Sequence, residues 1–145
     1  MRRGFTLIEL LIVMVIVTVM VGVAVPQYRR SVERGRAMEG LTNARAATDY
    51  VIAYRLVHGE NPDPTLMARD LIKSNYFGTP TISDVSGESD KSQITVQRLV
   101  NSGWNYKFVE IFSTSSLEPV SLKCINVGSE QVCQQLGFEA NTDLL

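Results

Sequence analysis

The chain has 145 residues, of which 45% are hydrophobic, and its formal net charge at pH 7 is −1. This length accommodates one membrane segment and one domain of ordinary size. A nearly neutral chain offers no general electrostatic basis for binding nucleic acid or anionic lipid. The sequence contains no Ser/His/Asp arrangement, P-loop or glycine-rich nucleotide motif, and its single histidine is His58. We therefore predict that the protein is not an enzyme, and that it has no cofactor and no Cys/His metal cluster.

The N-terminal part of the chain carries the most informative pattern. Arg2 and Arg3 precede an apolar run from Phe5 to Val25, in which Glu9 is the single charged residue. As a helix, this run would extend about 30 Å, which is the thickness of the hydrocarbon core of a bilayer. An ionised carboxylate in that layer costs at least ~2.5 kcal/mol. Glu9 is therefore expected to have a function and a partner.

A cleaved secretory signal peptide is the alternative reading of this N-terminus. The basic start fits it, but the apolar run is longer than the apolar region of a typical signal peptide. Val23-Ala24-Val25 is a poor match to a signal-peptidase site, and Glu9 is unusual in such a segment. We predict a transmembrane half-helix over residues 5–25.

The chain beyond the apolar run remains helix-prone. Pro26 marks the membrane exit and predicts a kink, because proline lacks an N–H and clashes with the preceding turn. The spacing of apolar and small residues over 26–58 predicts an amphipathic second half of the same helix. Its apolar or small stripe consists of Tyr28, Val32, Gly35, Met38, Leu41, Ala44, Thr48, Val51 and Arg55 or Leu56. Gly59 and the Asn-Pro-Asp-Pro segment at 61–64 predict the end of the helix.

Residues 59–91 are predicted to be a connecting loop with one short helix. Asp63 followed by Pro64 is a favourable helix start, with Asp as the N-cap and Pro at the first position. Residues 79–91 are rich in Ser, Thr, Gly, Pro and Asp, which is typical of a loop.

Residues 92–145 are predicted to form a small antiparallel sheet followed by the C-terminal region. Alternating patterns indicate strands over 92–100, 104–112 and 120–127, with a turn at 101–103. Such a meander needs a cover on one face, and the stripe of the long helix can supply it. Residues 128–136 are compatible with a fourth strand or with a short helix that is capped by Ser129 and ended by Gly137, and we favour the helix. The predicted fold class is α+β.

The two cysteines, Cys124 and Cys133, lie close together near the C-terminus. A membrane anchor followed by such a pair predicts a domain outside the cytoplasm, with a disulfide that closes a small loop. Two free thiols in a cytosolic domain are the alternative.

The segment G-F-T-L-I-E-L-L-I-V at 4–13 resembles the processing and methylation signature of type IV pilins and type II secretion pseudopilins. The long helix with Pro26 at the membrane exit, the sheet and the cysteine pair resemble the same family. The resemblance implies that a prepilin peptidase removes a leader of residues 1–4 by cutting between Gly4 and Phe5. Phe5 would then be N-methylated, and Glu9 would pair with the Phe5 amine of a neighbouring subunit. The alternative is that Glu9 reaches the membrane interface one turn from the helix start.

The resemblance implies a structural subunit of a homo-oligomeric filament. Its partners would be minor pilins, the prepilin peptidase, an inner-membrane assembly platform and, before assembly, the lipid bilayer. The precursor would be a single-pass protein of the bacterial inner membrane with a cytoplasmic N-terminus, and the filament would be extracellular or periplasmic. A type II secretion pseudopilin or a minor, priming pilin is the alternative within the family. A membrane-anchored binding module and a secreted soluble protein are the alternatives outside it.

The residues after the membrane segment offer secondary candidates. A plain positive-inside count would place the C-terminal domain in the cytoplasm because of four arginines, and the resemblance and the cysteines argue against this. These arginines are Arg29, Arg30, Arg34 and Arg36. We interpret them as a solvated helix face or a contact between subunits, with lipid headgroups, or DNA if the filament serves DNA uptake, as the alternatives. We interpret Asp84, Glu88 and Asp90 as part of a polar surface turn, with calcium as the alternative.

Overall fold

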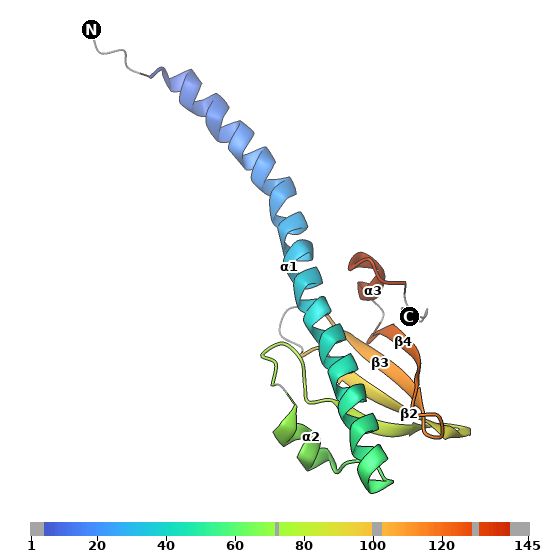
Figure 1. The fold of residues 1–145 in the computed structure, drawn as a ribbon. Helices are drawn as coiled ribbons and strands as arrows, with labels where there is room; N and C mark the ends of the chain where they lie inside the picture. Colours follow the sequence, from blue (N-terminus) through green and yellow to red (C-terminus); the bar gives the residue numbers. More distant parts are fainter. Residues whose placement is uncertain (1–4, 72, 100–102, 129–130, 140–145) are drawn as a thin grey trace. The chain divides into compact units, whose positions relative to one another are not determined.

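The computed structural model describes residues 5–71, 73–99, 103–128 and 131–139. It contains an N-terminal helix, a short helix, four strands and a last short helix (Figure 1). These elements are α1 (Leu7–His58), α2 (Pro64–Asp70), β1 (Thr81–Val85), β2 (Glu88–Gln97), β3 (Tyr106–Ser113), β4 (Pro119–Asn126) and α3 (Val132–Gln135). The chain divides into two compact units, Met1–Glu33 and Arg34–Leu145. The predicted α+β class, with a long helix and an antiparallel sheet, is confirmed.

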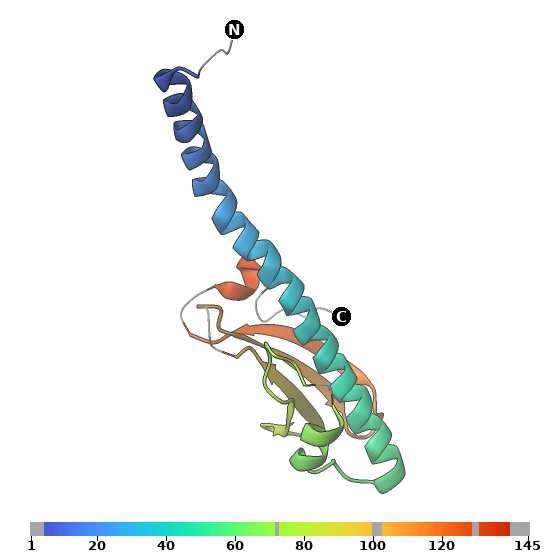
Figure 2. The same cartoon turned by 90° about the vertical axis from the view of Figure 1, so that its left-hand side faces the viewer.

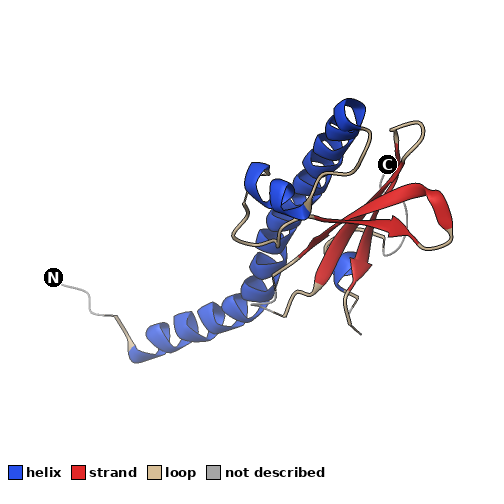
Figure 3. Ribbon diagram, turned by 90° about the horizontal axis from the view of Figure 1, so that it is seen from below, coloured by secondary structure: helices blue, strands red, loops and turns tan. Residues whose placement is uncertain are grey.

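The four strands form one antiparallel meander in the order β1-β2-β3-β4 (Figure 3). β3 lies in the interior of the sheet, and its residue Glu110 is paired with Ile94 of β2 and with Leu122 of β4. The expected alternation is present in β3, because Tyr106, Phe108 and Phe112 are all fully buried on one face. A sheet with one apolar face requires a covering layer.

The prediction of a loop over 79–91 is wrong, because β1 and the start of β2 form a hairpin there. The reversal occurs at Gly87, whose φ of 85° is readily adopted only by glycine. The polar composition of this segment is typical of a loop, but its backbone is paired with β2 along Thr81–Val85. Pairing with a neighbouring strand therefore outweighs local propensity at this edge of the sheet.

The part of α1 from Arg34 onward covers the sheet with a face of small side chains. Its buried core residues are Ala37, Leu41, Ala44, Ala47 and Val51. The predicted stripe is correct at Leu41, Ala44, Thr48 and Val51, but Gly35 and Met38 are exposed. Ala37 and Gly40 lie on the buried face instead, because small residues let the helix backbone approach the sheet closely. Figure 2 shows this half of α1 running alongside the strands.

The ring of Phe77 approaches α1 closely at Gly40. A Cβ atom added there would overlap the ring of Phe77, which is itself buried and packs edge-on against Tyr106. Gly40→Ala is therefore expected to destabilise the domain by about 1–3 kcal/mol, because Phe77 must move out of its site. Denaturant unfolding of the full chain in detergent micelles, followed by the fluorescence of the single tryptophan, Trp104, measures this loss.

Gly35→Ala is the matched control, because the space around Gly35 is open and the residue lies on the exposed face of the same helix. There the added methyl group is expected to stabilise the chain by roughly 0.5–1 kcal/mol through helix propensity. Equal effects of the two substitutions would contradict the close packing of Phe77 against α1.

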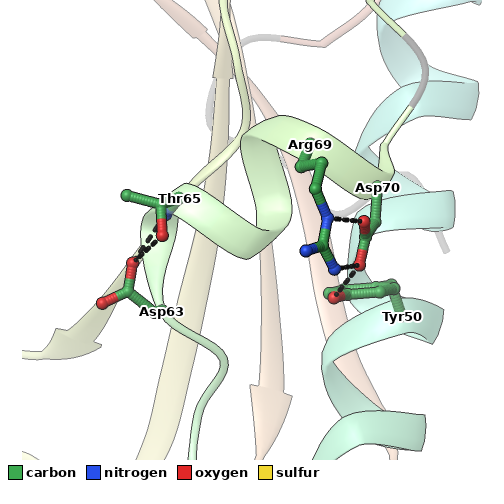
Figure 4. A network of polar contacts seen from close by, with 5 residues as sticks. All are labelled: Tyr50, Asp63, Thr65, Arg69 and Asp70. Atoms are coloured by element: carbon green, nitrogen blue, oxygen red, sulfur yellow. Dashed lines mark hydrogen bonds and ion pairs between the residues drawn. The ribbon is translucent and has the colours of Figure 1, made fainter.

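The predicted short helix begins as expected at Asp63 and Pro64 (Figure 4). The Asp63 carboxylate accepts hydrogen bonds from the Thr65 N–H (2.7 Å) and hydroxyl (2.6 Å), which lower the pKa of Asp63. At the other end of α2, Asp70 pairs with Arg69 and accepts a hydrogen bond of 3.0 Å from the Tyr50 hydroxyl of α1. These contacts fasten α2 beside the last turns of α1.

The C-terminal region is closed by a disulfide between Cys124 of β4 and Cys133 of α3, as the sequence predicted. The Cys133 N–H also donates to the Asn126 side-chain oxygen (2.8 Å). The favoured helix in the segment 128–136 is confirmed over Val132–Gln135, and Ser129, its expected cap, lies outside the described residues. Val132 of α3 and Leu136, which follows the helix, both belong to the core.

Candidate assembly site

The first half of α1 exposes a predominantly apolar surface. Every residue from Phe5 to Val25 is solvent-exposed in the single chain, with Phe5 at 82% and Leu7 at 83%. Exposed apolar surface of this extent indicates contact with lipid or with another protein. Within the described residues, α1 is the one helix whose length and composition would let it cross a membrane, and none of its apolar window is buried.

Glu9 caps the helix in which it lies. The Glu9 carboxylate oxygen Oε2 accepts hydrogen bonds from the Thr6 N–H and from the Thr6 hydroxyl, each at 3.3 Å. The Glu9 N–H in turn donates to the Thr6 carbonyl at 3.1 Å. Because α1 begins at Leu7, Thr6 occupies the N-cap position and Glu9 the third helical position, which are the positions of a capping box. A negative charge there also interacts favourably with the positive end of the helix dipole.

This cap gives the carboxylate polar partners within its own chain. The Glu9 side chain is thus held against Thr6, the residue that follows Phe5, at the start of the helix. Phe5 and Glu9 are both exposed, so a second molecule can reach either of them. Gly4, the other residue of the expected cleavage site, lies outside the described residues.

The capping role of Thr6 was not predicted from the sequence. The signal that would have indicated it is the Thr-x-x-Glu spacing at residues 6–9, immediately before an apolar run. The charge of Glu9 inside the apolar run does not by itself reveal the hydrogen bonds at the helix start.

Pro26 lies inside α1, which continues through it to His58. Because proline has no N–H, the carbonyl of Gly22, four residues earlier, cannot receive the hydrogen bond of a regular α-helix at this point. The kink expected at Pro26 stays a prediction.

Several of the secondary candidates are engaged in contacts with other residues. The Arg34 guanidinium donates to the Gln135 carbonyl (3.5 Å), and that of Arg36 lies 4.5 Å from the centre of the Tyr76 ring. Asp84 accepts a hydrogen bond from Ser92, and Glu88 pairs with Lys91. Among the described residues, no group of three or more His, Cys, Asp or Glu side chains is arranged to hold a metal ion.

The fold and this N-terminal helix define a class of protein. A long helix with an exposed apolar first half, followed by a small antiparallel sheet with a disulfide, is a pilin-like α+β architecture. Residues 1–25 match the family model described as the prokaryotic N-terminal methylation motif. The predicted resemblance of this N-terminus to that of type IV prepilins is thereby confirmed.

Similarity to curated proteins extends beyond the motif. The chain is 35% identical over 92 residues to a fimbrial protein of Neisseria meningitidis serogroup B, and the aligned region covers 63% of this chain and 49% of the relative. It is 33% identical over 88 residues to a type IV major pilin protein of Neisseria gonorrhoeae, covering 58% of this chain and 41% of the relative. A fimbrial protein of Dichelobacter nodosus is 31% identical over 94 residues, covering 64% of this chain and 58% of the relative. The matches thus span about half the length of these relatives, and no solved structure matches significantly.

Proposed function

We propose that this chain is a structural subunit of a type IV pilus-like filament and that it polymerises through its N-terminal helix. The observation that carries the proposal is the capped Glu9 carboxylate at the start of the exposed, largely apolar first half of α1, within a methylation motif. The names of the curated relatives, fimbrial protein and type IV major pilin, support the same function. They also favour a pilin over a type II secretion pseudopilin.

The proposed processing creates the partner that Glu9 needs. Hydrolysis of the peptide bond between Gly4 and Phe5 by a prepilin peptidase would release residues 1–4 and leave a new amine on Phe5, which is then methylated. A methylated amine remains a cation at neutral pH, so a positive charge is placed at the beginning of the apolar helix. Glu9 is the single acidic residue between Phe5 and Val25, and it is therefore the natural counter-charge.

Pairing between subunits would connect Glu9 of one molecule with the Phe5 amine of the next. The two partners use different surfaces, so the contact is head-to-tail, and repetition of such a contact without closure generates a helical filament. Two opposite charges attract strongly in surroundings of low dielectric, and either charge alone is costly there. The ion pair thus stabilises one register between neighbouring helices. On assembly, the apolar side chains exchange contact with lipid for contact with each other.

The proposed location and domain boundaries follow from this mechanism. Residues 5–25 would lie in the inner membrane before assembly. Residues 26–58 would carry the outer domain, which comprises the connecting segment 59–91 with its short helix and the sheet region 92–145. That domain would lie outside the cytoplasm, where the disulfide between Cys124 and Cys133 persists. Besides other copies of the chain, the proposed partners are minor pilins, the prepilin peptidase and the inner-membrane assembly platform.

Mass spectrometry of the mature N-terminus tests the proposal. In cells that contain the prepilin peptidase, we expect the chain to begin at Phe5 and to carry a methylated amine. In matched cells without the peptidase, we expect residues 1–4 to be retained. An N-terminus at Met1 in both strains, or a start beyond Val25, would contradict the proposed processing, and the second result would indicate a secreted protein with a cleaved signal peptide.

Imaging of cells that lack this chain distinguishes the pilin from the pseudopilin. Loss of surface filaments with intact protein secretion is expected for a major pilin. Loss of secretion with surface filaments still present would support the pseudopilin alternative.

A further inference from the structure

A buried acidic residue, Glu110, lies between the second half of α1 and the sheet. Glu110 is 3% exposed and occupies the inward face of β3 together with Phe108 and Phe112. Its partners across the sheet, Ile94 on β2 and Leu122 on β4, are both fully buried and apolar. A carboxylate in such surroundings loses most of its hydration, which is costly unless the charge is neutralised.

The hydrogen bonds around Glu110 indicate how this neutralisation occurs. The Thr48 hydroxyl of α1 lies 3.0 Å from Glu110 Oε2 and 3.2 Å from the Ala44 carbonyl oxygen. Both of these oxygens are acceptors when Glu110 is ionised, but a hydroxyl has a single hydrogen to donate. When Glu110 is protonated, its O–H can donate to Thr48, and Thr48 can donate to Ala44. The protonated form therefore satisfies both short contacts at once.

The charged groups near Glu110 do not supply a dominant counter-charge. On α1, Arg45 favours the ionised form and Asp49 opposes it, and both side chains are exposed. The residues facing Glu110 from β2 and β4 are apolar. Burial raises the pKa of Glu110 above its ordinary value, against the opposing effects of the Thr48 hydroxyl and Arg45, while Asp49 adds to the rise.

We propose that Glu110 is held as a neutral carboxylic acid whose proton completes a hydrogen-bond chain to Thr48 and Ala44. Ionisation of Glu110 leaves an unpaired charge between α1 and β3 and loosens the contact between them. The hydrogen-bond chain from Glu110 through Thr48 to Ala44 is thus a pH-sensitive contact, which we call the latch. As the pH rises, Glu110 releases to solvent the proton that connects the sheet to the helix. This latch is independent of the proposed filament function, because it concerns the packing within one subunit.

The direction of the pH effect follows from linkage. An acid whose pKa is higher in the folded chain than in the unfolded chain binds more protons when folded, so its contribution to stability falls as the pH rises. The full contribution of Glu110 is present below the ordinary pKa of a glutamate and is lost as the pH passes its raised value in the folded chain. Asp63 and Asp70, whose pKa values are lowered, act in the opposite direction and lose their contribution at low pH.

Direct titration of Glu110 tests the protonation state. The full chain in detergent micelles is labelled with ¹³C at glutamate carboxyl carbons, and E110Q assigns the signal. The signal of Glu110 is expected to titrate at a higher pH than that of a glutamate in an unstructured peptide. A midpoint equal to or below that of the peptide would overturn the proposal, whatever the stability of the variant.

Hydrogen exchange of the amides of α1 around Thr48 tests the latch itself. In the natural chain, we expect at least a several-fold loss of protection as the pH passes the midpoint of Glu110, after correction for the intrinsic pH dependence of exchange. E110Q keeps the shape and a donor group without a charge, so its protection is expected to be independent of this midpoint. The same pH dependence in both chains would overturn the proposal.

A pair of variants at Thr48 separates the hydroxyl from the packing. Thr48→Ser retains the hydroxyl and is expected to keep the pH-dependent protection, whereas Thr48→Val has the same shape without a hydroxyl and is expected to lose protection already at low pH. Loss of protection in the serine variant with retention in the valine variant would show that the hydrogen-bond chain does not fasten the helix.

Discussion

Glu9→Ala subunits are expected to be cleaved and inserted into the membrane but to be absent from filaments. The substitution would leave the positive Phe5 amine of a neighbouring subunit without its proposed partner in an apolar helix bundle. Loss of one partner of a buried ion pair costs about 3–5 kcal/mol, which corresponds to a decrease of roughly 10²–10⁴-fold in association. Fractionation of cells into membranes and sheared filaments, followed by immunoblotting, measures this decrease. Normal incorporation of Glu9→Ala into filaments would contradict the pairing.

Glu9→Gln is the matched control that separates the charge from the helix cap. Glutamine at the third helical position can accept the same hydrogen bonds from Thr6, so the capping box is retained while the negative charge is removed. If Glu9 acts through the ion pair between subunits, assembly of the glutamine variant is expected to be reduced as strongly as that of the alanine variant. Assembly of the glutamine variant alone would show that Glu9 acts through the cap of its own helix.

Removal of the disulfide is expected to have the second large effect. Replacement of Cys124 and Cys133 by alanine frees the loop between β4 and α3 in the unfolded chain, which lowers stability by about 2–3 kcal/mol for a loop of this length. Both sulfur atoms are fully buried, so the substitution also removes packing against the core. Denaturant unfolding of the full chain in micelles, monitored by Trp104 fluorescence, measures the loss.

The natural chain treated with a reducing agent is the control for this prediction. Reduction breaks the covalent link but keeps both side chains, so it is expected to reproduce the loop-closure part of the loss without the packing part. Addition of the reducing agent to the double alanine variant should have no effect. Unchanged unfolding of both the reduced chain and the variant would show that the link does not stabilise the domain.

The N-terminal helix was predictable because its determinants are local. An apolar run with one charge, a motif at 4–13 and a proline at 26 are properties of consecutive residues, and they do not depend on how the rest of the chain folds. The same is true of the start of α2 at Asp63 and Pro64, where the cap and the first helical residue are neighbours. The disulfide was also predictable, because the two cysteines follow a membrane anchor and allow a single pairing.

The errors have a common physical cause, which is that tertiary contacts decided them. β1 is a strand because it is paired with β2, although its composition is typical of a loop. The buried face of α1 includes Ala37 and Gly40 in place of Met38, because Phe77 packs against the backbone at Gly40. Size and hydrophobicity along one helix do not reveal where another part of the chain will approach it.

The linear order of residues was thus sufficient for the apolar helix, the methylation motif, the α+β class and the pairing of Cys124 with Cys133. These features arise from short-range periodicity, from a contiguous motif, or from a choice with one solution. The edge strand β1, the close contact at Gly40 and the burial of Glu110 against Thr48 were decided only by the tertiary structure. The contacts of Gly40 with Phe77 and of Glu110 with Thr48 join segments far apart in the chain, and β1 is decided by its pairing with the neighbouring β2. The free energy of these contacts outweighs the local preferences of the residues involved.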